Sequence, residues 1–198
     1  MVAIAICLAG SATMFAQETG VVINGVKWAT RNVDKLGTFA VNPESAGMLY
    51  QWNSKIGWSA TNPTASTNGS SWNPDSNHGR DAETWGKENN VCPVGWRMPT
   101  DDELKKLVDS GYEWTTVNGI NGIRFGSGKN IIFLPSVGAI SNAGSILMEF
   151  TFYWGNVANC TDSYYLYFKN NTDTEIFTGR YLGFPNASPA FCIRCVAE

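Results

Sequence analysis

Four cysteines are the residues of this chain whose type and spacing best suit chemistry. They are Cys92, Cys160, Cys192 and Cys195. Thiolates bind zinc, but zinc sites are usually built from paired Cys-x-x-Cys elements or from cysteines with partner histidines. Only the last two cysteines have that spacing and the chain has a single histidine, His78, so the pattern disfavours a metal site. The fifth cysteine, Cys7, lies in the run of residues 1–16 that we expect to be removed on export, and the even number that remains predicts two disulfides, with three connectivities open.

The two carboxyl-terminal cysteines are predicted to have different partners. Cys192 and Cys195 lie in the apolar stretch Phe191–Val196, which is typical of a strand. Residues three apart on a strand point to opposite faces of the sheet. We therefore expect these two cysteines not to bond to each other.

The cluster of acids Asp101-Asp102-Glu103 is better explained as the start of a helix than as a catalytic group. Thr100 precedes it, and Thr-x-x-Glu is a capping box, in which each side chain accepts a hydrogen bond from the other residue's amide. Acids in a first helical turn are also favoured by the helix dipole. No nucleophile–base signature accompanies the cluster, so we predict that the chain is not an enzyme.

Two other polar groups are assigned no chemistry. Asn73-Pro-Asp75 could offer oxygen ligands to calcium, but calcium typically takes six to eight of them, and this triplet is ordinary turn chemistry. His78 lies in a polar loop and is expected at the surface. We predict neither a cofactor nor a bound metal.

Residues 1–16 are predicted to be a signal peptide. The run has no charged side chain and ends on a small residue, Ala16, before Gln17-Glu-Thr-Gly. The basic n-region that usually precedes such a run is missing, which leaves open a start codon further upstream. A buried strand or helix of the fold is the alternative. The run is shorter than the roughly 20 apolar residues that cross a bilayer, so no membrane-spanning segment is expected. The sequence thus favours a secreted or cell-surface protein.

The composition favours a β-rich domain. Residues 17–198 are long enough for one domain with a hydrophobic core. The net charge is −3 and there is no basic run, which argues against a nucleic-acid partner. The chain has eight Trp, seven Tyr and ten Phe, a mixture that suits aromatic contacts in a loop-rich β protein.

The order of predicted elements is typical of an α+β fold. Asn24-Gly25 predicts a hairpin turn. A strand is expected at Met48–Trp52, a polar loop over residues 53–80, a short helix at Asp81–Glu88, and the main helix after Thr100 with Gly111 at its C′ position. Asn118-Gly119 and Asn121-Gly122 predict turns. Further strands are expected at Ile123–Phe125, Asn130–Pro135 (with Ile131–Leu134 buried on both faces), Phe150–Trp154, Ser163–Phe168, Thr174–Thr178 and Phe191–Val196.

Five sequence blocks in order resemble one known family. The blocks are Gly25-Val-Lys-Trp-Ala-Thr-Arg-Asn-Val, Gly47-Met-Leu-Tyr-Gln-Trp-Asn, Cys92-Pro-Val-Gly-Trp-Arg-Met-Pro-Thr, Phe125-Gly-Ser-Gly-Lys-Asn with Leu134-Pro-Ser-Val-Gly, and Tyr164-Tyr-Leu-Tyr-Phe with Cys192-Ile-Arg-Cys-Val. They resemble the Fibrobacter succinogenes major paralogous domain, a family of secreted or surface proteins of Bacteroidota and Fibrobacter. The chain departs from it at Phe152-Tyr-Trp-Gly-Asn-Val, where the family usually has Tyr-Tyr-Trp-Ser-Ser-Thr.

The resemblance implies a C-type-lectin-like fold, with short twisted antiparallel sheets, one or two helices and long loops. The formylglycine-generating enzymes share that fold. Carried over by position, the resemblance implies the disulfides Cys92–Cys195 and Cys160–Cys192. In the chain-entropy model, closing the long loop between Cys92 and Cys195 stabilises the fold by about 4–5 kcal/mol.

The carboxyl-terminal third is where we expect a ligand. Aromatic residues there alternate with Asn, Thr and Ser, which suits stacking and hydrogen bonding to a glycan or protein on another surface. The candidate ligand-binding residues are Tyr153, Trp154, Asn156, Asn159, Tyr164, Tyr181 and Asn186. The first hypothesis is therefore a non-catalytic binding or adhesion module. The alternatives are a variable receptor diversified by a retroelement, an oxidase-like relative of the formylglycine-generating enzymes, and a structural subunit of an appendage or matrix.

Overall fold

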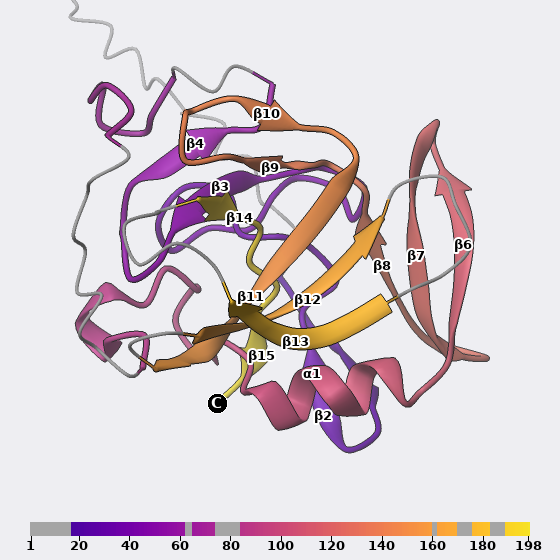
Figure 1. Ribbon diagram of the computed structural model, residues 1–198. Coiled ribbons are helices and arrows are strands. Elements are labelled where there is room, and N and C mark those ends of the chain that lie inside the picture. Colours follow the sequence, from indigo (N-terminus) through magenta and orange to yellow (C-terminus); the bar gives the residue numbers. More distant parts are fainter. Residues whose placement is uncertain (1–16, 62–64, 74–83, 160–161, 170–175, 183–188) are drawn as a thin grey trace, which may run out of the picture.

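The computed structural model describes residues 17–61, 65–73, 84–159, 162–169, 176–182 and 189–198. This part of the chain is mostly short antiparallel strands with a single α-helix, which agrees with the predicted α+β class (Figure 1). No helix in these residues has the length and apolar character needed to cross a membrane. The predicted signal peptide, His78 and Asp75 lie outside the described residues.

The first half of the chain contains β1 (Val21–Ile23), β2 (Val26–Trp28), β3 (Met48–Gln51), β4 (Gly57–Ser59), η1 (Lys87–Asn89), β5 (Trp96–Arg97), α1 (Asp101–Val108) and β6 (Tyr112–Val117). The second half contains β7 (Ile120–Ser127), β8 (Asn130–Pro135), β9 (Ala139–Ile140), β10 (Ile146–Leu147), β11 (Phe150–Asn159), β12 (Asp162–Lys169), β13 (Ile176–Leu182), β14 (Ala190–Phe191) and β15 (Val196–Ala197).

One sheet joins the two ends of the described chain. Its strand order is β1-β2-β15-β5, so the carboxyl-terminal strand lies between the amino-terminal hairpin and the strand before the helix. The hairpin turn is Asn24-Gly25, as predicted, and both residues have positive φ, at 45° and 78°. The disulfide between Cys92 and Cys195 links the loop before β5 to the residue before β15. This confirms the first of the two expected disulfides.

The end of the chain crosses between sheets. Phe191–Val196 was predicted as one strand, and this prediction is wrong. β14 lies between β3 and β9 in a second sheet of order β10-β9-β14-β3-β4, whereas β15 belongs to the terminal sheet. The crossing places Cys192 and Cys195 in two different core clusters. The two cysteines therefore point to different sides, as expected, although no continuous strand carries them.

Two three-stranded sheets complete the fold, β6-β7-β8 and β11-β12-β13. Asn118-Gly119 forms the predicted turn between β6 and β7. The turn predicted at Asn121-Gly122 is wrong, because both residues lie inside β7 and pair with β6, and Gly122 also pairs with β8. Gly122 is required there for another reason, since a Cβ atom would collide with the backbone oxygen of Leu134. The prediction that β8 is buried on both faces is confirmed for Ile132, Phe133 and Leu134.

The helix α1 begins as predicted. The Thr100 hydroxyl accepts from the Glu103 amide at 3.2 Å, and the Glu103 carboxylate accepts from the Thr100 amide at 2.8 Å. The helix packs against β11, β12 and β13 and buries Leu104 and Leu107 (Figure 1). Gly111 has φ of 84°, but the prediction that it is the C′ residue is wrong by one position, because the helix ends at Val108 with Asp109 as its C-cap. In the described part of the predicted Asp81–Glu88 helix there is only the start of the 3-10 turn η1.

Candidate functional site

A row of half-buried aromatic side chains covers one face of the β11–β12 ribbon. Phe150 and Phe152 come from β11, and Tyr165 and Tyr167 come from β12. Alternate residues of a strand share a face, and the pairing of Phe152 with Tyr167 sets the two pairs side by side. The residues between them point to the opposite face and are buried in the core, namely Thr151, Tyr153, Leu166 and Phe168.

The rings of this row are held by one another and by Phe191. The Phe152 ring stacks on Phe191, with centroids 4.5 Å apart and an interplanar angle of 14°, and on Tyr167, at 5.3 Å and 24°. Tyr165 meets Phe152 edge-on at 5.4 Å. Backbone bonds from Cys192 to Phe152 and from Trp154 to Cys192 fix the segment that carries Phe191. The row is therefore a preorganised apolar surface, since these contacts restrict its side chains before any ligand arrives.

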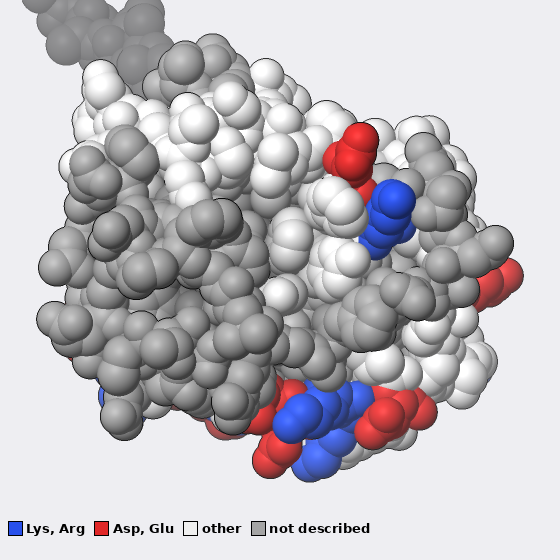
Figure 2. All heavy atoms as spheres, in the orientation of Figure 1, with Lys and Arg blue, Asp and Glu red and all other residues white. Residues whose placement is uncertain are grey.

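The surroundings of the row carry few charges. Lys169 lies 6.0 Å from the centroid of the Phe150 ring, which makes one cation–π contact at the end of the row. Leu147 and Met148, just before β11, are 41% and 59% exposed. In Figure 2, charged side chains gather over α1 and at a few points on the right, and the described surface between them is uncharged. The face thus offers aromatic and aliphatic contact rather than a strong electric field.

Two of the predicted ligand-binding residues are core residues, and this corrects the prediction. Tyr153 is 1% exposed and Trp154 is 2% exposed. The Tyr153 hydroxyl donates to the carbonyl of Pro135 at 3.1 Å, and the Trp154 indole donates to the carbonyl of Tyr50 at 2.7 Å. Tyr153 points inward because of the alternation along β11. Trp154 lies on the same side as Phe152 but is covered by Trp52 and Phe191.

The other predicted residues have different outcomes. Asn156 is half-buried, and its side-chain oxygen has no hydrogen-bond partner among the described residues. Asn159, Tyr164 and Tyr181 belong to β11, β12 and β13, but the description extends only to their backbones. Asn186 lies outside the described residues. A ligand role for these residues stays a prediction.

The sequence prediction missed Phe150, Phe152, Tyr165 and Tyr167 as surface residues. A signal for them was present, because aromatic residues recur at every second position in both strands. Period two assigns residues to a common face, but it does not say which face meets the core. That choice depends on the neighbouring elements, which only the structure supplies.

Cys192 is a free and buried thiol. The predicted Cys160–Cys192 disulfide is therefore not formed, and Cys160 itself lies outside the described residues. Burial raises the pKa of the Cys192 thiol to about 12, although Arg194 and a hydrogen bond with Tyr153 act in the opposite direction. The thiol is accordingly protonated at neutral pH, which disfavours a thiolate ligand at this position.

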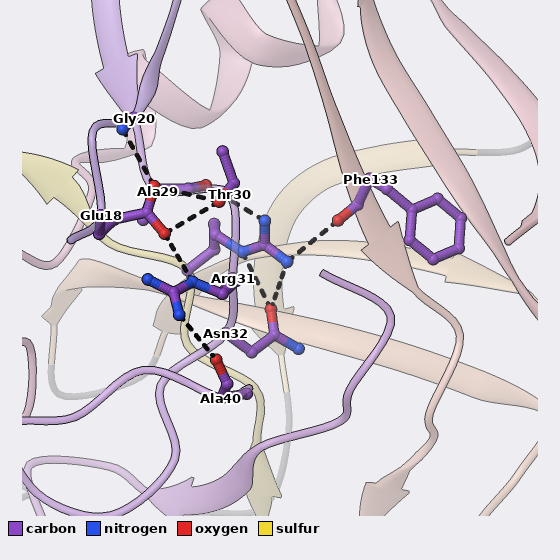
Figure 3. Close-up of polar contacts among 9 residues, drawn as sticks. Glu18, Gly20, Ala29, Thr30, Arg31, Asn32, Ala40 and Phe133 are labelled. Carbon is purple, nitrogen blue, oxygen red and sulfur yellow. Dashed lines mark hydrogen bonds and ion pairs between the residues drawn. The ribbon is translucent and has the colours of Figure 1, made fainter. Parts of the chain in front are cut away.

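A second polar group is buried where the two ends of the chain meet (Figure 3). Arg194 is 1% exposed and has no carboxylate in direct contact among the described residues. Its guanidinium donates twice to the Asn32 side-chain oxygen, at 2.9 and 2.7 Å, and to the carbonyls of Ala29 and Phe133 at 3.2 and 3.0 Å. Burial lowers the pKa of Arg194, which is opposed by nearby groups including Tyr153 and Glu18.

Glu18 holds the beginning of the domain beside this group. Its carboxylate accepts hydrogen bonds from Arg31 at 2.9 Å, from the Thr30 hydroxyl at 2.9 and 3.0 Å, and from the Gly20 amide at 3.0 Å (Figure 3). Burial on its own would raise the pKa of Glu18. The hydrogen bonds outweigh burial and hold the pKa below its ordinary value of 4.5.

The variant Glu18→Gln is expected to lose about 1–3 kcal/mol of unfolding free energy at neutral pH, because it loses hydrogen bonds to a charged acceptor. Since the folded-state pKa of Glu18 is lowered, its contribution is complete above pH 4.5 and is lost as the pH falls through the lowered pKa. The difference from wild type should therefore shrink in acid. Urea unfolding over a pH series tests this, with Glu149→Gln, at an exposed residue, as the control. A difference that is constant with pH would contradict it.

The acids of the first helical turn have structural partners. Glu103 forms an ion pair with Arg97, whose Nη2 lies 2.7 Å from its Oε1, in addition to capping the helix. Asp101 contacts Lys105 one turn further along at 3.3 Å. In the described part of the chain, no three His, Cys, Asp or Glu side chains gather in a way that could hold a metal ion.

Comparisons with protein-family models, with curated proteins and with solved structures found no match for this chain. The class that the structure defines is a largely antiparallel α+β protein with one described α-helix and a disulfide-linked carboxyl terminus. Within that class, the aromatic row on β11–β12 is the described surface that best suits a ligand.

Proposed function

We propose that this chain is a secreted or cell-surface binding module with a C-type-lectin-like fold, which holds a glycan or protein ligand without catalysis. The observation that carries the proposal is the aromatic row of Phe150, Phe152, Tyr165 and Tyr167, which is half-buried and held by stacking. Rigid aromatic side chains bring a large contact area at little cost in conformational entropy. Tyrosine also adds a hydroxyl that can donate or accept a hydrogen bond.

The arrangement of the chain ends supports the proposed fold family. The resemblance implied a bond between a cysteine near the first helix and the last strand, and Cys92–Cys195 makes that connection. The terminal strands also share one sheet, with β15 between β2 and β5. The disulfide matches what the resemblance implies.

The disulfide supports the proposed location. Disulfides persist in oxidising compartments and are rare in the reducing cytosol. The apolar run of residues 1–16 before Gln17 is consistent with export. We therefore place the mature domain, residues 17–198, outside the cell or on its surface.

The oxidase-like alternative is disfavoured by the cysteines. A copper-binding cysteine pair at Cys192 and Cys195 would need two thiolates together. Cys195 is bonded to Cys92, and the Cys192 thiol is buried with a raised pKa. These two sulfur atoms are thus not available as a ligand pair in this structure.

The double variant Tyr165→Ala with Tyr167→Ala is expected to weaken ligand binding by about 30-fold or more, because it removes two anchors of the kind that dominate interfaces. The ligand is first found by screening the wild-type domain against a glycan array and a panel of cell-surface proteins. The affinity of each variant is then measured by titration, with thermal unfolding as a check on folding. Leu36→Ala, which removes an exposed apolar side chain outside β6, β11 and β12, is the control.

The same two screens can also contradict the proposal. A wild-type domain that binds neither glycans nor surface proteins above background would remove its basis. A ligand whose affinity is unchanged by the double variant would move the site away from the aromatic row.

A further inference from the structure

The outer edge of β6 is an unusual feature of the surface. β6 is the first strand of the β6-β7-β8 sheet, and Figure 1 shows it at the rim of the molecule. It pairs with β7 through six consecutive residues without a bulge, from Tyr112–Phe125 to Val117–Ile120. Proteins usually protect such an edge with proline, with several charges or with a bulge. β6 has none of these, apart from the single charge of Glu113.

The backbone groups that face outward can be assigned from the alternation of antiparallel hydrogen bonds. The Gly126 amide donates to the Gly111 carbonyl at 3.2 Å, so Gly111 and every second residue after it face β7. The Asn121 carbonyl accepts from the Ser136 amide, so the backbone groups of the odd-numbered residues of β7 face β8 and those of the even-numbered residues face β6. This agrees with the assignment for β6. The amides and carbonyls of Tyr112, Trp114 and Thr116 therefore point away from the sheet.

These outward groups are open to a further strand. Among the described residues, no backbone hydrogen bond reaches Tyr112, Trp114 or Thr116 from the side opposite β7. The strand is rich in aromatic and β-branched residues, which favour strand pairing. The edge thus combines free hydrogen-bonding groups with side chains that suit a sheet.

We propose that β6 pairs antiparallel with β6 of a second copy of this chain, about a two-fold axis through Trp114. With a two-fold axis perpendicular to the sheet, a given side chain lies on the same face of the sheet in both copies. Residues that pair across the interface also share a face, so an even-numbered residue can pair only with an even-numbered one, and an odd-numbered residue only with an odd-numbered one. The register centred on Trp114 brings Tyr112 opposite Thr116 and lets the backbone groups of all three outward residues bond across the interface. A continuous six-stranded sheet results.

The side chains of β6 match those of a second copy in this register, because aromatic residues meet aromatic or β-branched residues and no like charges meet. In this register Glu113 lies opposite Thr115 of the other copy, so no like charges oppose each other. Glu113 also has Arg124 as a cross-strand neighbour, 3.9 Å away. Trp114–Trp114 is an aromatic pair and Tyr112–Thr116 is an aromatic–β-branched pair, and both kinds stabilise adjacent strands. An edge of this length buries much less than the roughly 1,200–2,000 Å² of a stable interface, so the dimer should be weak and should depend on concentration.

Opposite charges at Thr115 test the register. Thr115→Lys places a lysine opposite Glu113 of the other copy on both sides of the axis, and should tighten the dimer about three- to tenfold. Thr115→Glu opposes two pairs of like charges and should weaken it by a similar factor. Sedimentation equilibrium over a wide range of protein concentration measures both. Ser127→Lys and Ser127→Glu, at the exposed end of β7, are matched controls that should leave the dimer unchanged.

A cysteine pair tests the same geometry without relying on charge. Mixing Glu113→Cys protein with Thr115→Cys protein should give a disulfide-linked heterodimer in higher yield than either protein alone, because these two positions face each other. A wild-type domain that stays monomeric at every concentration would overturn the proposal. So would Lys and Glu variants that shift association in the same direction, or a domain that binds an extended peptide at β6 but not itself. None of these results depends on the aromatic row.

Discussion

Replacing both Cys92 and Cys195 by alanine is expected to lower the free energy of unfolding by about 4–5 kcal/mol. The two cysteines are 103 residues apart, and their bond closes a loop that contains α1 and the strands from β5 to β14. Without it, the unfolded chain regains the conformational freedom of that loop. The effect is large against the roughly 5–15 kcal/mol that stabilises a typical domain.

Guanidinium unfolding monitored by tryptophan fluorescence measures this loss, and Cys192→Ala is the matched control. That variant removes a buried thiol that crosslinks nothing, so only a small packing loss is expected. A reducing agent should lower the unfolding free energy of the wild-type protein as much as the double substitution does. It should lower that of Cys192→Ala by the same amount, because this variant keeps the Cys92–Cys195 bond. A double variant as stable as wild type would show that the loop is already restricted in the unfolded chain.

The elements with local signals were predictable from the sequence. The hairpin at Asn24-Gly25 and the helix after Thr100 are both encoded by a few adjacent residues, and both were placed correctly. Asn121-Gly122 shows the limit of such signals. The dipeptide has the composition of a turn, but it lies in a strand because β6 and β8 pair with it on both sides. Tertiary pairing overrides a local preference when each backbone group finds a partner in the sheet.

The candidate site was predictable to the strand but not to the face. The aromatic content of the β11 and β12 regions pointed to this part of the chain, yet Tyr153 and Trp154 were chosen and proved to be buried. Trp154 lies on the same side as Phe152 and is buried because Trp52 and Phe191 cover it. Tyr153 differs from Phe152 by a single step along β11. Such a step reverses the side of the sheet, and its direction is set by what covers each face. Here the covering residue is Phe191, from a segment that crosses between two sheets.

Arg194 could not be predicted as a buried residue at all. Arginine is almost never fully buried unless it is paired, and nothing near Cys192-Ile-Arg-Cys in the sequence names a partner. The partners are Asn32 and the carbonyls of Ala29 and Phe133, which are far away along the chain. The burial of Arg194 follows from the position of the terminal segment, in which β14 lies between β9 and β3 and β15 lies between β2 and β5.

The variant Arg194→Met is expected to lower the free energy of unfolding by about 3–5 kcal/mol, because it leaves buried acceptors without their donor. Methionine has a similar length and fills much of the same volume, so the loss reports on the hydrogen bonds more than on a cavity. Arg124→Met is the matched control, since Arg124 is partly exposed and its one ion pair with a described residue, Glu113, is long at 3.9 Å. Its expected cost is at most about 1 kcal/mol.

A double-mutant cycle with Asn32→Leu separates the Arg194–Asn32 interaction from packing. Removing both partners takes away an unsatisfied donor and an unsatisfied acceptor together, so the double variant should be more stable than the sum of the single losses predicts. A coupling of about 1–3 kcal/mol is expected for two short hydrogen bonds to one charged group. Strictly additive losses would show that the Arg194 and Asn32 side chains do not stabilise each other. In that case the loss in Arg194→Met would come from its bonds to the carbonyls of Ala29 and Phe133 or from packing.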